Sequence, residues 1–111
     1  MEVKTMSQIT VAKKRENEKL TFLLDGRADS STAEQLREEM LNDLDGVTNI
    51  EVDCEKLSYI SSSGLRIILI LFKRITAAGG TLVITKPTRK VMEVLKITGL
   101  IEIFPIKDNI A

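Results

Sequence analysis

Histidine is absent from the 111-residue sequence. It is the commonest general base, the usual activator of a serine nucleophile and a frequent zinc ligand. Its absence therefore excludes serine–histidine catalysis and every histidine-ligated metal site. Two pairs of carboxylates remain, Glu38 with Glu39 and Asp43 with Asp45. They fall on the polar side of an expected helix and its exit, so we interpret them as solvated surface. We expect no enzyme activity, no metal and no cofactor.

Cysteine and long apolar runs are also scarce. Cys54 is the only cysteine, so no internal disulfide is possible, and a reduced compartment is the simplest inference. The longest apolar run, residues 67–72, is far shorter than the roughly 20 residues that a bilayer span needs. No secretory signal is visible either. We therefore expect a cytoplasmic protein.

Neither sign of charge is in excess, because 16 basic residues balance 16 acidic ones. This balance removes the electrostatic attraction on which binding to nucleic acids and to anionic membranes relies. Nucleic acid and membrane are therefore not expected as partners. Hydrophobic residues make up 43% of the chain, which argues against disorder. Together with the length, this predicts a single domain over residues 1–111 with one core.

The hydrophobic patterns predict an α/β fold. Two strand-like runs joined by a polar turn indicate a β-hairpin, and strands then alternate with helices, which favours parallel pairing through right-handed crossovers. The sheet should therefore be mixed, with four to five strands. We expect strands at 8–14, 19–24, 50–54 and 82–84, a last strand or extended tail at 101–106, and helices from Ser30-Ser31-Thr32 to Gly46, from Gly64 to Ala78 and from Pro87-Thr88 to Gly99.

The second expected helix is apolar almost all round. On a helical wheel one side should face the core, and it carries Leu65, Ile68, Leu69, Phe72 and Ile75. Ile67 and Ile70 fall on the other side, among Arg66, Lys73 and Arg74. One interpretation is that neighbouring helices cover the two isoleucines. The other is that they form part of a partner-binding patch, because exposed apolar groups ringed by charge often mark interfaces.

Three serines, Ser61, Ser62 and Ser63, directly precede this helix. Capping of the helix needs only one of them, so the simplest interpretation is a cap within a polar loop. The functional interpretation is that one serine accepts a phosphate. First-turn amides and the helix dipole favour a dianion at this position. The same phosphate would add about −1.5 to −2 charges to the rim of any interface built on the helix.

Two segments resemble the STAS domain family of anti-sigma factor antagonists. Residues 57–69 have the sequence LSYISSSGLRIIL, similar to the family's apolar strand end, serine-serine-glycine-leucine motif and apolar helix. Residues 24–29, LDGRAD, look like the family's strand, glycine and aspartate ahead of the first helix. The order of elements agrees from about Ser7 to Ile106. The resemblance implies a STAS fold, with helices packed mainly on one face of the sheet.

The resemblance also implies a site. The phosphorylated serine maps onto Ser62, with Ser61 and Ser63 as the alternative acceptors, and Asp29 and Gly64 lie near the phosphate or a weakly bound nucleotide. The implied partner is an anti-sigma factor that is itself a serine kinase, captured only by the unphosphorylated antagonist; a serine phosphatase resets the switch. We assign the partner-binding surface to Ser61, Ser63, Arg66, Ile67, Ile70 and Arg74.

One departure from the family keeps other functions open. The family has an aspartate before the phosphorylated serine, where this chain has Ser61. A serine still caps a helix, but the local charge is lost. The alternative function is therefore a STAS scaffold without a phosphate, or a regulatory subunit of a transporter. A nucleotide-binding enzyme is a third hypothesis, disfavoured because the sequence has no phosphate-binding loop of the Gly-x-x-x-x-Gly-Lys type.

Overall fold

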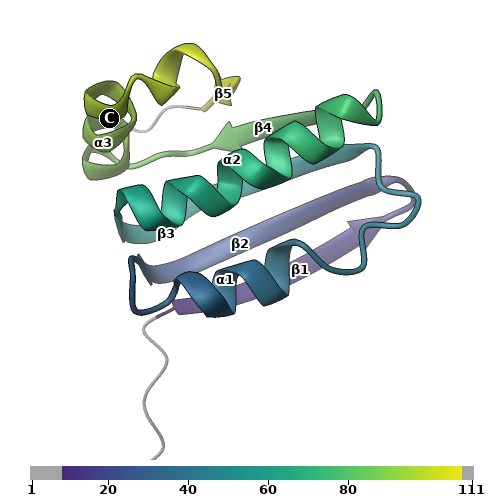
Figure 1. The fold of residues 1–111 in the computed structure, drawn as a ribbon, viewed down its shortest axis with the longest axis horizontal. Coiled ribbons are helices and arrows are strands. Elements are labelled where there is room, and N and C mark those ends of the chain that lie inside the picture. The colour runs from purple at the N-terminus through teal and green to yellow at the C-terminus, as the bar shows by residue number, and fades with distance from the viewer. Residues whose placement is uncertain (1–8, 109–111) are drawn as a thin grey trace, which may run out of the picture.

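The computed structural model describes residues 9–108. One five-stranded sheet and three α-helices account for most of this range (Figure 1). In chain order the elements are β1 (Ile9–Glu16), β2 (Lys19–Ala28), α1 (Ala33–Met40), β3 (Asn49–Ile60), α2 (Ser62–Ala77), β4 (Thr81–Thr85), α3 (Arg89–Thr98), the 3-10 helix η1 (Leu100–Glu102) and β5 (Ile106–Lys107).

The sheet is mixed, as the sequence predicts. Its strands lie in the order β1-β2-β3-β4-β5; β1 pairs with β2 antiparallel, and the other neighbours pair in parallel. The hairpin turns tightly at Asn17, whose φ of 57° lies in the left-handed region that asparagine tolerates. Gln8, the expected first residue of the hairpin, lies outside the described residues.

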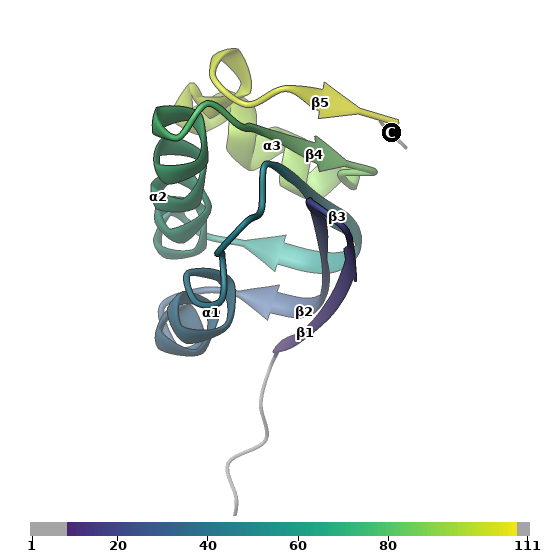
Figure 2. The ribbon, with the colours of Figure 1, turned by 90° about the vertical axis from the view of Figure 1, so that its right-hand side faces the viewer.

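β3 is twelve residues long, and two irregularities in its register against β2 bend it. Leu23 pairs with Asp53 and Asp25 with Lys56; further along, Gly26 pairs with Leu57 and Arg27 with Tyr59. At each step β3 has one residue more than β2, which is the count of a β-bulge. Figure 2 shows the strand curving towards the helices, so its end leads directly into α2.

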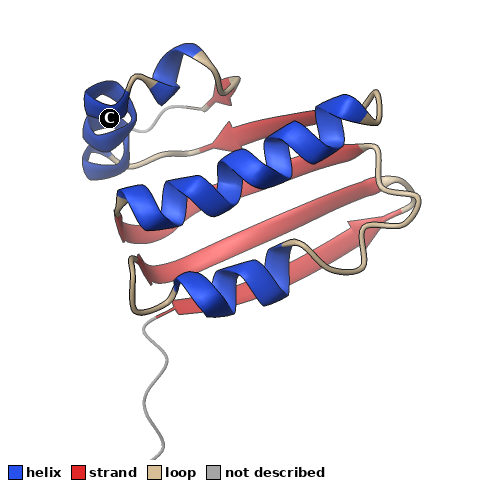
Figure 3. Cartoon of the chain, in the orientation of Figure 1, coloured by secondary structure: helices blue, strands red, loops and turns tan. Residues whose placement is uncertain are grey.

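The helices α1 and α2 lie side by side on one face of the sheet (Figures 2 and 3). Alternate residues of β2 point into this layer, where Leu20, Phe22 and Leu24 are buried. α3 lies beyond the end of β4 and packs against β3 (Figure 1). The prediction of a sheet with its helices mainly on one face is therefore confirmed.

The core face of α2 is rotated from the predicted one, and this corrects one assignment. Ile67 is only 2% exposed, and Leu71 is fully buried, whereas Leu69 and Phe72 are only partly covered. α1 packs beside α2 and closes a second side of the helix. Because its side chain is enclosed, Ile67 offers no surface to a partner, and its predicted role in the binding patch is wrong. Ile70 is half-buried.

Two other elements differ from the prediction. α1 ends at Met40 rather than running on towards the predicted stop at Gly46, and Asp43 adopts a φ of 57°, incompatible with a continuing helix. Leu44 still packs against the core, but from a loop. Near the other end, the expected strand at 101–106 is mostly η1 and a turn, and β5 is confined to Ile106–Lys107.

Candidate functional site

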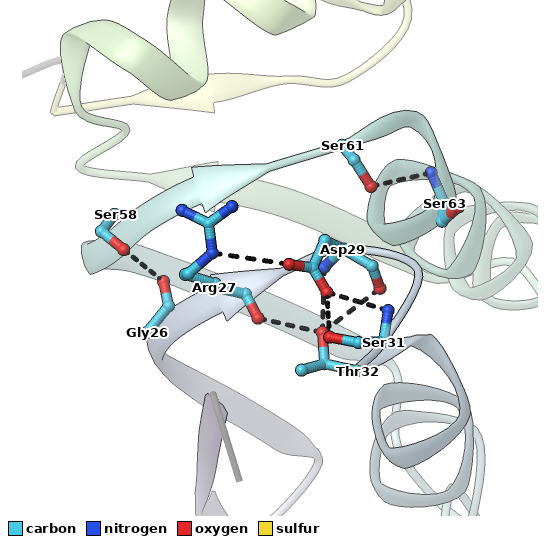
Figure 4. A network of polar contacts seen from close by, with 8 residues as sticks. All are labelled: Gly26, Arg27, Asp29, Ser31, Thr32, Ser58, Ser61 and Ser63. Atoms are coloured by element: carbon cyan, nitrogen blue, oxygen red, sulfur yellow. Dashed lines mark hydrogen bonds and ion pairs between the residues drawn. The ribbon is translucent and has the colours of Figure 1, made fainter. Parts of the chain in front are cut away.

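The site lies where β2 and β3 end. These strands are parallel, so the segments that follow them leave the sheet at the same edge. Ala28 pairs with Ile60, and the Ser61 N–H donates to the Ala28 carbonyl oxygen at 2.8 Å. Figure 4 shows the consequence: Asp29 and Ser61, far apart in the sequence, stand on neighbouring strand ends. The structure therefore brings together the two segments that the sequence singles out.

The loop that begins at Asp29 is held by its own side chains (Figure 4). One carboxylate oxygen of Asp29 accepts hydrogen bonds from the Ser31 backbone N–H at 2.9 Å and from the Ser31 hydroxyl at 2.6 Å. The other oxygen pairs with Nε of Arg27 at 3.4 Å. Both oxygens are thus engaged, one by the loop and the other by the end of β2.

Thr32 occupies the N-cap position of α1 but does not cap it with its side chain. Its hydroxyl instead accepts from the Asp29 N–H at 2.9 Å and donates to the Arg27 carbonyl oxygen, also at 2.9 Å. The expected capping function of Ser30-Ser31-Thr32 is therefore replaced by one that closes the loop. The hydroxyl of this threonine links the end of β2 to the start of the helix.

The pKa of the Asp29 carboxyl lies below its ordinary value, chiefly because the Ser31 hydroxyl donates to its ionised form; the Ser31 and Thr32 backbones and Arg27 act in the same direction. The contribution of this carboxylate to stability is therefore present at neutral pH and is lost as the pH falls through the folded-state pKa.

Ser31→Ala should raise the pKa of Asp29 towards the ordinary value, because the strongest hydrogen bond to the carboxylate is removed. A carbon-13 NMR titration of the side-chain carboxyl measures the change. Ser30→Ala is the matched control, since Ser30 is exposed and makes no hydrogen bond with Asp29 in the described structure. Equal pKa values in the two variants would contradict this account of the loop.

Ser61 is the N-cap of α2. It has extended backbone angles, φ −103° and ψ 177°, and its Oγ accepts a hydrogen bond from the Ser63 N–H at 3.2 Å. This bond satisfies one of the free amides of the first turn. Ser62 is the first residue of the helix and is exposed, whereas Ser61 and Ser63 are half-buried. Of the three predicted acceptors, Ser62 is thus the one most open to a modifying enzyme.

Ser61→Ala should lower the free energy of unfolding by about 1 kcal/mol, the usual cost of losing an N-cap side chain. For a domain of this size the melting temperature would fall by roughly 5 °C. Ser63→Ala is the matched control, because it removes a hydroxyl two residues away and retains the backbone N–H that donates to Ser61. Thermal unfolding followed by circular dichroism compares them; equal melting temperatures would contradict the capping role.

Gly64 is buried where α2 comes close to the ends of β2 and β3. A Cβ at this position would stand 2.8 Å from the Ala28 carbonyl oxygen, 2.9 Å from the Ala28 Cβ and 3.1 Å from Cγ1 of Ile60. A real Cβ does not tolerate such distances, so the helix start could not lie where it does. The glycine of the motif therefore serves packing, and it fixes the height of Ser62 above the strand ends.

The exposed side of α2 is basic. The helix carries Arg66, Lys73 and Arg74, all exposed, and has no acidic residue along its length. Ser62 lies on the same side, since Arg66 follows it by four residues. We call the side formed by Ser62, Arg66, Ile70 and Lys73 the docking face. Arg74 lies towards α1, where its guanidinium reaches the Leu41 carbonyl oxygen at 3.5 Å.

Sequence reasoning did not find the part that Arg27 plays. Its guanidinium lies 4.4 Å from the ring centre of Tyr59 and pairs with Asp29, so it joins β2, β3 and the loop. Ser58 supports the same edge by donating to the Gly26 carbonyl oxygen at 2.9 Å. A signal was available: Arg27 and Asp29 carry opposite charges and stand two residues apart, a spacing that brings side chains to one face at the end of a strand.

The buried thiol of Cys54 takes no part in the site. The pKa of this thiol is raised to about 12, chiefly because burial removes water from its ionised form and in addition because the Asp53 carboxylate lies nearby. Within residues 9–108 no three histidine, cysteine or acidic side chains are grouped so that they could hold a metal ion. No helix in this part of the chain has the length and apolar character needed to cross a bilayer.

A profile of the STAS domain matches residues 9–111. The chain belongs to the STAS domain family. This confirms the resemblance seen in residues 24–29 and 57–69, and with it the STAS fold. The match includes every element described above.

Two relatives of this STAS protein are similar over most of both chains. BtrV of Bordetella bronchiseptica, by its name a candidate anti-sigma factor antagonist, is 37% identical over 91 residues, which cover 81% of this chain and 78% of BtrV. The anti-sigma F factor antagonist of Paenibacillus polymyxa is 31% identical over 92 residues, covering 81% and 79%.

Solved STAS structures share the fold. The anti-sigma factor antagonist SpoIIAA in its unphosphorylated form superposes with a TM-score of 0.76 at 24% identity, covering 87% of both chains. The phosphorylated form of SpoIIAA from Bacillus superposes with a TM-score of 0.69 at 23% identity, covering 87% of this chain and 90% of that one. At these identities the likeness concerns the fold.

Proposed function

We propose that this STAS protein is an anti-sigma factor antagonist, a regulatory protein rather than an enzyme, which captures an anti-sigma factor through the docking face of α2 and releases it when Ser62 is phosphorylated. The observation that carries the proposal is the position of Ser62, exposed at the first residue of α2 and on the edge of the basic side of that helix. Two relatives above 30% identity that carry the name of antagonist support the choice of partner.

The chemistry of the helix start suits a phosphate. A phosphoserine at the first helical position meets free first-turn amides and the positive end of the helix dipole, so the fold tolerates the added charge. The same charge lies on the docking face, where it would repel the acidic groups of a partner that binds Arg66 and Lys73. A kinase that is the anti-sigma factor itself adds the phosphate, and a serine phosphatase removes it.

Asp29 has a supporting function in this proposal. Its carboxylate is ionised and fully engaged by Ser31 and Arg27, so it keeps the loop beside the helix start in one conformation. A weak contact with the nucleotide of the kinase would be made at this loop. The single, buried cysteine fits a reducing cytoplasm.

A second candidate function is favoured by one observation. Ser61 replaces the family's aspartate, and it caps α2 without adding charge. A STAS scaffold or transporter subunit that is never phosphorylated would need the cap alone. In that case the docking face would still bind a protein, and phosphorylation of Ser62 would not affect that binding.

Affinity capture from the native cell tests the proposal. The tagged chain should retain an anti-sigma factor, identified by mass spectrometry, and Lys73→Glu should lose it, because the exposed docking face changes its charge. Lys107→Glu on β5 is the matched control and should retain the same partner. Recovery of no anti-sigma factor, or equal recovery with both variants, would contradict the proposed function.

A further inference from the structure

Arg66 stands one helical turn after Ser62, on the same side of α2. Both residues are exposed. Side chains four residues apart on a helix have Cβ atoms about 5–6 Å from each other, and a long side chain at the second position tends to point back towards the helix start. The guanidinium of Arg66 can therefore reach a group attached to the Ser62 oxygen.

Arg27, beside the helix start, and Arg74, near the far end of α2, are already held by other groups. Arg27 is paired with Asp29 and lies against Tyr59, and Arg74 bonds the Leu41 carbonyl oxygen. In the part of the chain that the structure describes, the Arg66 guanidinium has neither an ion pair nor a hydrogen bond. It is thus a cation of α2, one turn from Ser62, that a new anion can recruit without breaking an existing contact.

We propose that Arg66 is the counter-ion of a phosphate on Ser62: its guanidinium forms a bidentate pair with two phosphate oxygens and is thereby no longer free to pair with an acidic partner. The proposal rests on the proposed function, since it takes Ser62 as the acceptor. Planar, two-pronged pairing with phosphate is the interaction for which arginine is better suited than lysine. Arg66 would then pair with the partner when Ser62 is unmodified and with the phosphate when Ser62 is phosphorylated.

This pairing gives the phosphate two effects on binding. It adds negative charge at one end of the docking face, and it withdraws one of the positive charges that attract an acidic partner. The phosphate therefore weakens binding both by its own charge and by occupying Arg66.

Phosphorus-31 NMR tests the pair directly. The full chain is made with phosphoserine incorporated at position 62, and the second pKa of the phosphate is titrated at low ionic strength, where exposed charges are least screened. A nearby cation favours the dianion, so Arg66→Gln should raise this pKa by roughly half a unit. Arg66→Lys should give an intermediate value.

Lys73→Gln is the matched control. It removes a positive charge from the same side of α2, but eleven residues beyond Ser62, about 16 Å along the helix axis. The phosphate pKa of the Lys73→Gln protein should stay within about 0.2 units of the phosphate pKa of the parent protein. An Arg66→Gln value equal to that of Lys73→Gln would overturn the proposal. Because the phosphoserine is built in, this result does not depend on any kinase, so failure of the pair and failure of the proposed function are told apart.

Discussion

Ser62→Asp should weaken capture of the anti-sigma factor at least tenfold. The substitution adds a negative charge to the exposed start of α2, beside a face whose other charges are Arg66 and Lys73. A partner that fits this face brings acidic groups to it, and like charges in an interface cost several kcal/mol. Surface plasmon resonance with the immobilised partner, once captured and purified, measures the dissociation constant.

Two variants make the result specific. Ser62→Ala should bind like the parent, because an exposed hydroxyl contributes little by itself. Asn17→Asp adds the same charge to an exposed residue of the hairpin turn, at the opposite end of β2 from the site, and should also bind normally. If Ser62→Asp binds as tightly as these two, charge at the helix start does not control the interface and the scaffold function gains.

Gly64→Ala should destabilise the fold by about 2–3 kcal/mol, in the range of overpacked cores. The new methyl group would stand closer than 3.0 Å to both the carbonyl oxygen and the Cβ of Ala28, so the start of α2 must move away from β2. This outcome reverses the usual rule, since alanine ordinarily stabilises a helix relative to glycine by up to about 1 kcal/mol. Urea unfolding measures the free energy.

Gly79→Ala is the informative comparison. Nothing lies within 4 Å of a Cβ built on Gly79, but its φ of +86° is left-handed. Gly79→Ala should therefore lower the free energy of unfolding by about 1–2 kcal/mol, entirely through backbone strain at this residue. A Gly64→Ala protein as stable as the parent would mean that α2 does not need this close approach, and that the motif's glycine has another function.

The elements that the sequence predicts best are those with strong local chemistry at their ends. Thr88 caps α3 through a bond from the Val91 N–H, and Gly99 ends it with a φ of 80°, both at the predicted residues. The hairpin and the parallel strands likewise follow from short alternating patterns and their order. Such signals do not depend on distant parts of the chain, so the sequence alone suffices for them.

Tertiary contacts decide the rest. Nothing in the periodicity of residues 101–106 distinguishes a strand from η1 followed by a turn; Phe104 is buried edge-on against Phe72, and this contact fixes the path. Ile67 is buried in a helix that packs against α1 as well as the sheet, and a helical wheel does not show the position of a neighbouring helix. The predicted binding patch therefore included one residue that is buried.

The candidate site, too, can be predicted from the sequence only in part. Its position follows from the sequence, because parallel strands bring Asp29 and Ser61 to one edge. The hydrogen bonds that hold the loop of the site cannot be predicted from the sequence, because Ser31 and Thr32 could equally have capped α1. Only the folded chain shows that Thr32 closes the loop and that Arg27 joins it to Tyr59.

The most direct measurement compares two pools of this protein from the native cell, one bound to its anti-sigma factor and one free. Quantitative mass spectrometry of the tryptic peptide that contains residues 61–63 gives the phosphorylated fraction of each pool and the modified residue. We predict phosphate on Ser62, confined to the free pool. Phosphorylated Ser62 at equal levels in both pools, or no phosphate in either, would contradict the account.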